Sequence, residues 1–390
     1  MKKLALVTIA TGIFAWGSAT AKGPRDHLGY VAEYARYYGI DIGEARHRIS
    51  ATDRAIEIQT ALRDNTPDTF SGMYVEHKPK FRVVAKFTSP PSAAIRPLLQ
   101  SPAISVQFGD HSETELKAAL AAVTQDLGSR GIRHLAGIEI QRSKVLVEVA
   151  PEDATRIGAA YAAKNSSIYE WRVAQGFVAP TFAPYAAYYG ADRLWGSTGK
   201  ICTSGFHAKL ADGTAVITTA GHCDDQMRIW NSSGQQIPLA GQRVKGSLDL
   251  QWLRYSSSVY YLAPGISNGS WTYDIRAVRS KSQMIVGQHV CKYGDTTYTT
   301  CGDISRLDSV EMFNGERGNY IQVHHQNGSV MNDGGDSGGP VYAWHEGVGY
   351  AAYGIVHGRG DVGTTIRNDL FFMPSDGYAA AGLTIMVRTD

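Results

Sequence analysis

The chain lacks the features of a nucleic-acid-binding or membrane-spanning protein. Its 390 residues carry 38 Lys and Arg against 36 Asp and Glu, which leaves a net charge of only +2 without any long basic run. Nothing in this pattern indicates a nucleic acid partner. No run of 18 apolar residues follows residue 21, so we expect the rest to be soluble and to have no membrane contact. There is no convincing metal-binding loop, and we expect neither a metal nor another cofactor.

The first 21 residues have the composition of a signal peptide. Lys2 and Lys3 give a positively charged start, residues 4–16 are apolar but short for a membrane span, and residues 19–21 (Ala-Thr-Ala) form a cleavage site. The exported chain would begin at Lys22. We therefore expect a secreted protein, either extracellular or periplasmic.

Cysteine is also scarce. The chain has only four cysteines, and all of them fall between Cys202 and Cys301. They could be free thiols in a core. An even number together with an export signal instead favours two disulfides, for which three pairings are possible.

The remaining composition is that of a folded, β-rich protein. With 43% hydrophobic and 19% charged residues the chain can bury a substantial core, and its length suffices for two or three domains. The 42 glycines and 21 tyrosines suit strands that are joined by many turns.

Residues 22 to about 180 contain no catalytic motif. Apolar spacing and turn residues predict two small α+β modules, at about 22–110 and 111–177. Ser112, followed three residues later by Glu115, predicts a capped helix start. The expected elements are a helix at 42–63, a hairpin of 73–75 and 81–87, a helix at 113–127, strands at 135–141 and 144–149, and a helix from about 151.

From about residue 188 the pattern changes to short strands separated by clusters of Gly, Asn, Asp and Ser. Helical periodicity does not return until 376–383. Many short strands with regular turns predict a sandwich or barrels. The fold class is therefore mainly β, preceded by an α+β region.

Two stretches in this β-rich part contain the candidate catalytic residues. Residues 335–340 are Gly-Asp-Ser-Gly-Gly-Pro, and the glycines around Ser337 allow a sharp turn that a substrate can approach closely. Residues 218–223 are Thr-Thr-Ala-Gly-His-Cys and follow an apolar run, 215–217, that predicts a buried strand able to hold His222 rigidly. A serine hydroxyl needs such a base to become a nucleophile. Each stretch alone also fits a structural role, as a surface turn or as a histidine beside a disulfide.

In the order His then Ser, the two stretches resemble the motifs of the trypsin-like serine proteases. More narrowly they resemble the bacterial secreted branch, the streptogrisins and alpha-lytic protease. The resemblance implies two six-stranded antiparallel β-barrels with the active site between them, His222 on the first barrel and Ser337 on the second. The disulfides expected from this family match the two local pairs, Cys202–Cys223 and Cys291–Cys301.

The chemistry of this family needs a carboxylate that orients the imidazole. Asp249 is the best candidate because it lies between His222 and Ser337 in the chain and is flanked by apolar residues. Asp274 is the rival. The resemblance implies that Ser337 attacks the substrate carbonyl, that His222 moves the proton, and that the backbone amides of Gly335 and Ser337 form the oxyanion hole.

Asp336 lies beside the nucleophile and needs a partner if it is buried. In the bacterial branch it pairs with an arginine directly after the first cysteine of the second disulfide, and here that place holds Lys292. Lysine offers a point charge in place of a bidentate fork, so the ion pair would be looser. The alternative is a solvated Lys292.

The expected specificity pocket departs from the family pattern. Met331 stands where relatives often carry a cysteine of a third disulfide, and it would give an apolar wall. His357 replaces a serine that normally supports the catalytic aspartate, which puts that support in doubt, and Arg359 replaces a glycine. With Gly358, these residues predict an apolar or small P1 residue (the substrate residue before the cut bond), and an acidic P1 is the alternative.

The N-terminal region resembles the pro-region of alpha-lytic-type proteases, which acts as a folding catalyst and tight inhibitor before it is removed. Residues 70–77 followed by 81–84 are the best local match. The boundary would lie in 177–184, a segment with two prolines, and the cut between about 178 and 192. A permanent ligand-binding domain is the competing interpretation. The expected domains are a signal peptide at 1–21, a pro-region at 22–185 and a protease domain at 186–390.

Together these features predict a secreted, monomeric serine endopeptidase that is made as a self-processed zymogen and cleaves polypeptides. Its pro-region would be its own chaperone and inhibitor. The alternative from another class is a non-catalytic homologue that keeps its N-terminal domain and binds a partner, which the departures at Met331, His357 and Lys292 motivate. An esterase with the same triad is a further alternative.

Overall fold

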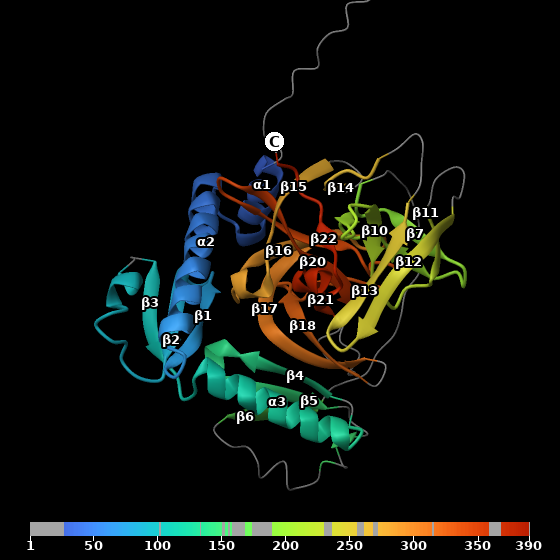
Figure 1. Ribbon diagram of the computed structural model, residues 1–390. Helices are drawn as coiled ribbons and strands as arrows, with labels where there is room; N and C mark the ends of the chain where they lie inside the picture. The colour runs from blue at the N-terminus through green and yellow to red at the C-terminus, as the bar shows by residue number, and fades with distance from the viewer. Residues whose placement is uncertain are drawn as a thin grey trace, which may run out of the picture.

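The N-terminal helices and small sheets lie against one side of a larger β-rich body in the computed structural model (Figure 1). Three sequence predictions lie outside the described residues: the signal peptide at 1–21, the linker at 177–184 and the pocket residue Arg359. Most of the helix expected from about 151 does so too. The described residues are 27–100, 103–132, 134–149, 153–154, 157, 168–173, 189–229, 236–255, 261–267, 272–313, 316–358 and 368–389.

The first N-terminal unit combines two helices with a three-stranded sheet. Helix α1 (His27–Tyr38) is followed by the longer α2 (Ile42–Asn65). Helix α2 begins where the Asp41 carboxylate accepts the amide of Glu44 at 2.9 Å, which satisfies a donor that the helix itself leaves free. The sheet contains the predicted hairpin, and its strands are, in spatial order, β1 (Phe70–Glu76), β2 (Arg82–Phe87) and β3 (Ile104–Phe108).

The second unit packs helix α3 (Glu113–Ser129) on three strands. Ser112 Oγ accepts the amide of Glu115 at 3.2 Å, and the Glu115 carboxylate accepts the amide of Ser112 at 2.7 Å. The predicted capping box, helix and strand pair are therefore confirmed. The strands are β4 (His134–Glu139), β5 (Lys144–Val149) and β6 (Tyr169–Val173).

Strand β4 joins this unit to the C-terminal part of the chain. It pairs antiparallel with β17 (Tyr298–Phe313), in a register that sets Gly137 opposite Ser309 and Ala136 opposite Val310. The β4-β5-β6 strands therefore extend a sheet of the C-terminal body, along its lower edge in Figure 1.

The C-terminal strands close into a six-stranded antiparallel barrel. The ladder runs from β16 to β17, β18, β21, β20 and β19, and back from β19 to β16. The predicted C-terminal helix, α6 (Asp376–Ala380), follows β21. The other strands of this sheet are β16 (His289–Gly294), β18 (Glu316–His324), β19 (Pro340–His345), β20 (Gly349–Gly358) and β21 (Leu370–Pro374), with β14 (Gly265–Ser267) and β15 (Thr272–Val278) beyond β20.

The N-terminal sheet of the β-rich body is curled but does not close within the described residues. Its order is β22-β9-β10-β13-β12-β11-β7-β8. The mainly β prediction is confirmed, and of the two expected barrels the C-terminal one closes completely. The strands are β7 (Arg193–Gly196), β8 (Ile201–Thr203), β9 (Ala208–Lys209), β10 (Ala215–Thr219), β11 (Gln226–Ile229), β12 (Gln236–Lys245), β13 (Leu248–Arg254) and β22 (Thr384–Ile385).

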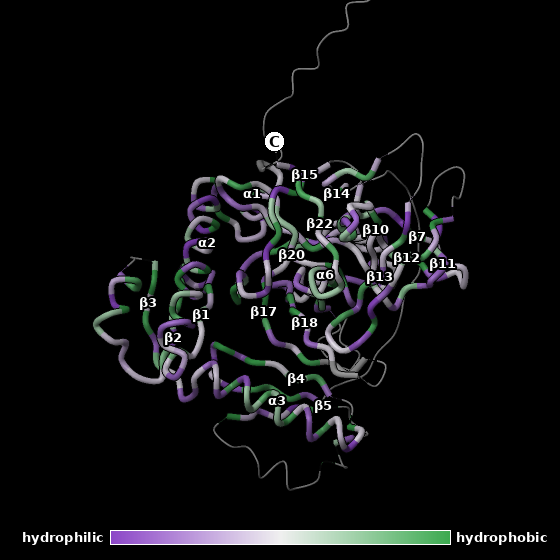
Figure 2. The backbone as a smooth tube through the Cα atoms, viewed as in Figure 1, coloured by the Kyte–Doolittle hydropathy of each residue, from purple (hydrophilic) through white to green (hydrophobic). Residues whose placement is uncertain are grey.

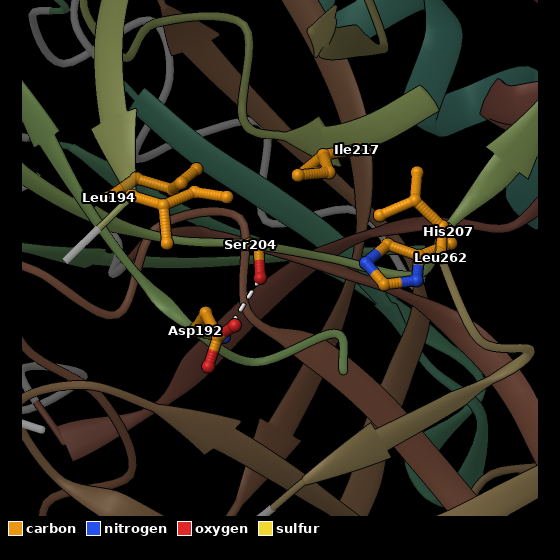
Figure 3. Close-up of a pocket in the computed structure, with 7 residues that line it drawn as sticks. Asp192, Leu194, Ser204, His207, Ile217 and Leu262 are labelled. Carbon is orange, nitrogen blue, oxygen red and sulfur yellow. Dashed lines mark hydrogen bonds between the residues drawn. The ribbon is translucent and has the colours of Figure 1, made fainter. Parts of the chain in front are cut away.

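The side chains on the inner face of this curled sheet are closely packed and stabilise the fold. Figure 3 shows Leu194, Ile217, Leu262 and His207 lining one small space, and the amide of Asp192 donates to Ser204 Oγ at 2.8 Å. Burial lowers the pKa of His207 to about 4, so its ring is neutral near pH 7.

Apolar side chains form one large core through the barrel, the N-terminal sheet and the β4-β5-β6 unit. Figure 2 shows polar segments along α2 and apolar segments along β4 and β20, as a surface helix and buried strands require. None of the helices in the described part of the chain has the length and apolar character needed to cross a membrane.

Polar contacts fix α1 and α2 to the barrel. The Asp53 carboxylate of α2 lies 2.5 Å from Nδ1 of His345 on β19, and the Gln59 side chain donates to the carbonyl of Met284 at 2.9 Å. The Tyr30 hydroxyl of α1 donates to the carbonyl of His289 at 2.7 Å. The N-terminal helices are thus held by hydrogen bonds as well as by apolar packing.

The buried imidazole of His289 is the centre of this contact. Its Nδ1 lies 2.8 Å from Asp303 Oδ1, and its Nε2 lies 3.5 Å from Glu33 Oε2 of α1, an ion-pair distance without good hydrogen-bond geometry. Burial by itself lowers the pKa of His289, but the contacts with Asp303 and Glu33 outweigh it and raise the pKa to about 9. An imidazolium therefore bridges the barrel to α1 at neutral pH.

The attachment of α1 should weaken as the pH rises through 9. A raised pKa stabilises the folded state fully below the unfolded value of about 6.5, and this stabilisation is lost as pH passes the folded value. The shift corresponds to about 3 kcal/mol. We expect the melting temperature of the uncleaved chain to fall between pH 6.5 and 9.5, and to fall less in a His289→Gln variant.

The other titratable groups around His289 do not change their protonation state between pH 6.5 and 9.5. Burial raises the pKa of the nearby tyrosines of α1 and lowers that of His77 and His325, so all of them stay neutral. A Glu33→Gln variant should reduce the pH dependence in part. Equal pH dependence in the parent and in His289→Gln would contradict the prediction.

Candidate active site

The pairing of two neighbouring strands brings His222 and Asp249 together. Strand β10 pairs antiparallel with β13, and its last residue, Thr219, lies opposite Gln251. His222 follows Thr219 by three residues and Asp249 precedes Gln251 by two. Antiparallel direction therefore carries both to the same end of the sheet.

Ser337 reaches this end from the turn before β19. Nε2 of His222 lies 2.9 Å from Ser337 Oγ, and Nδ1 lies 2.7 Å from Asp249 Oδ2. The amide of His222 also donates to Asp249 Oδ1 at 2.9 Å. The rival carboxylate, Asp274, lies on β15 and pairs with Arg388 at 2.7 Å. The structure thus brings together the three residues that the sequence analysis preferred.

Asp249 stays ionised in this setting. Its side chain is fully buried, whereas that of His222 is 25% exposed. Burial raises the pKa of Asp249, but hydrogen bonds and charge interactions with His222 and His357 outweigh it and hold the pKa well below its ordinary value. A buried carboxylate of this kind can stabilise a positive charge on a neighbouring imidazole.

The turn of Ser337 is tied to the N-terminal sheet at β8. The amide of Thr203 donates to the carbonyl of Ser337 at 2.8 Å, and the Thr203 hydroxyl donates to the carbonyl of Gly335 at 2.8 Å. Gly338 has a φ of +85°, and a Cβ there would come within 2.5 Å of the Thr203 carbonyl oxygen, so only glycine fits.

Both predicted disulfides are present. One joins the neighbour of Thr203 to the neighbour of His222, which places a covalent link beside the site. The other closes the hairpin of β16 and β17. The bonded pairs are Cys202–Cys223 and Cys291–Cys301.

Hydrogen bonds to the carbonyls of Gly334 and Asp336 orient the amides of Gly335 and Ser337. Each of these carbonyls forms one peptide group with the amide that follows it. The Thr296 hydroxyl donates to the carbonyl of Gly334 at 2.5 Å, and the amide of Gly339 donates to the carbonyl of Asp336 at 2.9 Å. In a trans peptide the N–H points away from the C=O, so both amides are fixed in direction. Among the described residues neither amide has an acceptor, which leaves both able to bind an anionic oxygen.

Lys292 lies against Asp336 with no exposed surface on either side chain. Its Nζ donates to Asp336 Oδ2 at 3.0 Å, to the Tyr298 carbonyl at 3.0 Å and to the Thr297 hydroxyl. These three acceptors satisfy the three N–H groups of an ammonium ion, so lysine fits where relatives use arginine. Burial is the main cause of a lowered pKa of Lys292, and Asp336 counteracts it.

The Asp336 carboxylate also organises the loop of residues 296–297. Oδ1 accepts the amides of Thr296 and Thr297 at 2.8 and 3.1 Å, and Oδ2 accepts the amide of Asp333 at 2.9 Å. Thr296 in turn orients the Gly334 peptide. The sequence analysis did not identify the two threonines, because isolated threonines in a turn carry no distinctive signal.

The predicted pocket residues lie in different environments. Met331 is fully buried, and its amide donates to the carbonyl of Asn368 at 2.9 Å. Gly358 is half-buried at the end of β20. His357 turns its ring to Asp249, with Nδ1 2.5 Å from Oδ2, although the sequence analysis put support of the aspartate from this position in doubt. Their contribution to a specificity pocket stays a prediction.

Two clusters of the described residues have the ligand types of a metal site. Glu33 and His289 lie near the second disulfide, whose sulfurs are already bonded to each other. In the other cluster, His222, Asp249 and His357, both imidazoles are hydrogen-bonded to the Asp249 carboxylate. A metal would have to displace these hydrogen bonds, so proton transfer is the better use of the second cluster.

The chain thus has the chymotrypsin-like fold, a closed antiparallel barrel beside a second, curled antiparallel sheet, and His222 and Ser337 meet between the two. No protein-family model matches the chain. Serine protease 1 of Rarobacter faecitabidus is 24% identical over 324 residues, which cover 81% of this chain and 56% of that protein. The chain thus spans little more than half the length of that relative.

Two further curated proteins are similar to part of this chain over nearly all of their own length. Serine protease 2 of Streptomyces fradiae is 28% identical over 171 residues, 42% of this chain and 93% of that protein. Glutamyl endopeptidase 2 of Streptomyces griseus is 25% identical over 208 residues, 50% of this chain and 98% of that protein. Together with the fold, these relatives support a bacterial trypsin-like serine protease.

Solved structures of the same kind align with the chain. Thermobifida fusca protease A is 23% identical with a TM-score of 0.41, and covers 52% of this chain. A glutamic acid specific serine protease, described as using a histidine triad in substrate binding, is 22% identical with a TM-score of 0.41, and covers 51% of this chain. Both are aligned over 100% of their own length.

Proposed function

We propose that the chain is a serine endopeptidase that hydrolyses polypeptides through an acyl-enzyme intermediate. The observation that carries this proposal is the unbroken series of contacts from Ser337 Oγ through His222 to the buried Asp249, at 2.9 and 2.7 Å. Polypeptides are the substrate class because the curated relatives are named as proteases and an endopeptidase.

In the proposed reaction Ser337 Oγ attacks the scissile carbonyl carbon while His222 Nε2 takes the hydroxyl proton. Asp249 stabilises the imidazolium that forms and keeps the ring in place. The amides of Gly335 and Ser337 donate to the oxygen that becomes negative, each worth about 3 kcal/mol. His222 then protonates the leaving amine as the C–N bond breaks, and water, activated in the same way, releases Ser337 from the ester.

We infer that residues 22–185 are a pro-region of a secreted zymogen, with the protease domain at 186–390. The contacts of α1, α2 and β4 with the C-terminal barrel support a region that assists folding. The similarity to the Rarobacter protein extends over 324 residues, more than the 205 residues of 186–390, so it includes part of the N-terminal region. Self-cleavage near 178–192 would release the mature monomer.

For the P1 residue we propose an apolar or small side chain, because Met331 is a buried, apolar candidate for the pocket wall. The similarity to Glutamyl endopeptidase 2 favours the alternative, an acidic P1. Peptide substrates that differ only at P1 separate the two. Cleavage after glutamate that exceeds cleavage after alanine and leucine would support the alternative.

A fluorophosphonate probe tests the catalytic proposal. The purified secreted protein should cleave casein, should be labelled by the probe at Ser337, and should no longer cleave casein once it is labelled. Matched peptide and ester substrates distinguish a peptidase from an esterase. A folded protein that neither binds the probe nor cleaves peptides would instead be the non-catalytic homologue, with its N-terminal domain retained for binding.

A further inference from the structure

Asp249 accepts hydrogen bonds from two imidazoles. Oδ1 accepts the amide of His222, and Oδ2 accepts Nδ1–H of His222 at 2.7 Å and Nδ1–H of His357 at 2.5 Å. His222 and Asp249 belong to the N-terminal sheet, whereas His357 belongs to β20 of the C-terminal barrel. The second imidazole therefore links the two halves of the site through one carboxylate.

A β-bulge aims His357 at this carboxylate. The register of β20 against β21 sets Val356 opposite Phe372 and Gly358 opposite Phe371, which leaves His357 as the extra residue. A bulge re-aims the side chain that it contains. A regular strand in this register would have no unpaired residue to turn toward Asp249.

Tyr320 holds the ring of His357 in its orientation. The two rings are stacked with centroids 3.9 Å apart and an interplanar angle of 6°. Tyr320 is fully buried on β18, and its hydroxyl donates to the carbonyl of Gly246 at 3.3 Å, three residues before Asp249. The ring of His357 is nearly perpendicular to that of His222, at 89°. The two imidazoles thus approach Asp249 from different directions.

We propose that His357 is a positioning residue of the catalytic site, which donates Nδ1–H to Asp249 and so fixes the carboxylate that orients His222. This proposal rests on the proposed serine-protease function. Nδ1–H of His357 gives Oδ2 of Asp249 a second donor, from a ring nearly perpendicular to that of His222. An imidazole, unlike a hydroxyl at the same place, can also bind a second proton and then competes with His222 for the carboxylate.

The titratable groups that the structure places against His357 are Asp249, His222 and Tyr320. The two imidazoles outweigh the effect of burial and hold Asp249 ionised, and Tyr320 contacts His357 by ring stacking. Each of the two imidazoles has a second ring nitrogen that can bind a proton. The acid limb of log kcat/KM against pH should approach a slope of two, because two coupled protonations each weaken the site.

Variants at His357 test this proposal in the full secreted chain. His357→Ala should lower kcat by about 100-fold with little change in KM, because a misplaced base mainly affects the transition state. His357→Ser, which restores a donor, should recover to within about tenfold of wild type. The serine variant should also show an acid limb with a slope of one.

His207→Asn is a matched control. His207 is equally buried but lies in the N-terminal sheet with its Nδ1 2.9 Å from the carbonyl of Ala263. Its replacement should lower the melting temperature and leave the shape of the pH profile unchanged. If His357→Ser keeps the wild-type rate and a slope of two, the positioning role is wrong. If His357→Ala does not fold, the serine variant alone decides.

Proton NMR separates this inference from the proposed function. The uncleaved wild type should show two low-field N–H signals, from His222 and His357, and His357→Ser should keep only one. A wild type that lacks probe labelling and peptide cleavage would refute the proposed function, whereas the NMR signals would still report the contact with Asp249. A single low-field signal in an active wild type would overturn the inference alone.

Discussion

Replacement of Ser337 by alanine is expected to lower kcat for peptide hydrolysis by about a million-fold and to leave the secreted chain at its full length. The hydroxyl that His222 contacts at 2.9 Å is the atom that would form the covalent intermediate. Without it, only transition-state binding by the fixed amides remains, and removal of the nucleophile alone costs about as much as removal of the whole triad. Intact mass and initial rates of both secreted proteins measure the effect.

Ser282 provides a control for the mutation itself. It lies away from Ser337, in the short 3₁₀ turn before the barrel, and its hydroxyl contacts that of Ser280 at 2.9 Å. Ser282→Ala should be processed and active like wild type. If the Ser337→Ala chain shortens as wild type does, another protease matures the protein and the self-processing proposal fails. If neither chain shortens, the N-terminal half is a permanent domain.

Replacement of Lys292 by alanine is expected to have the second largest effect. It leaves the fully buried carboxylate of Asp336 without its ion partner, and breaking a buried pair in this way costs about 3–5 kcal/mol. Asp336 orients Thr296, and Thr296 orients the peptide that carries the Gly335 amide. We therefore expect kcat to fall by about 100- to 1000-fold, the loss typical of a misplaced oxyanion-hole donor.

Three variants make the Lys292 result specific. Lys292→Arg keeps the charge and should retain most activity, because relatives of this type use arginine there. Lys292→Met combined with Asp336→Asn removes both charges and should be more stable than Lys292→Ala. Arg54→Ala breaks an exposed pair with Glu57 and should change stability by less than about 1 kcal/mol. Urea unfolding and probe labelling report the two effects. Wild-type turnover in Lys292→Ala would refute the role of this pair.

The sequence supports the positions of His222, Asp249 and Ser337 because local patterns specify them. An apolar strand before His222, a glycine-rich turn around Ser337 and apolar neighbours of Asp249 are each readable within a few residues. The Lys292–Asp336 contact could be predicted as well, because the residues at these two positions form an ion pair in the family that the chain resembles. The helix at α3 followed from its capping residues in the same way.

Three features could not be predicted from the sequence. The direction of His357 depends on a bulge whose existence is a property of the register between β20 and β21, and register is set by long-range packing. The pairing of β4 with β17 joins residues more than 170 positions apart, and nothing in either strand specifies its partner. Whether the N-terminal sheet closes into a barrel likewise depends on how its edge strands are placed in three dimensions.

If the N-terminal region is removed as proposed, the loss of β4 changes the surface of β17. While β4 is attached, the backbone groups of residues 309–310 are paired across the ladder with residues 136–137. Removal of the N-terminal region would expose this edge of β17, with N–H and C=O groups ready to accept another strand. The mature enzyme would then carry a template for β-addition that its precursor keeps covered, and a second copy or an extended peptide could occupy it.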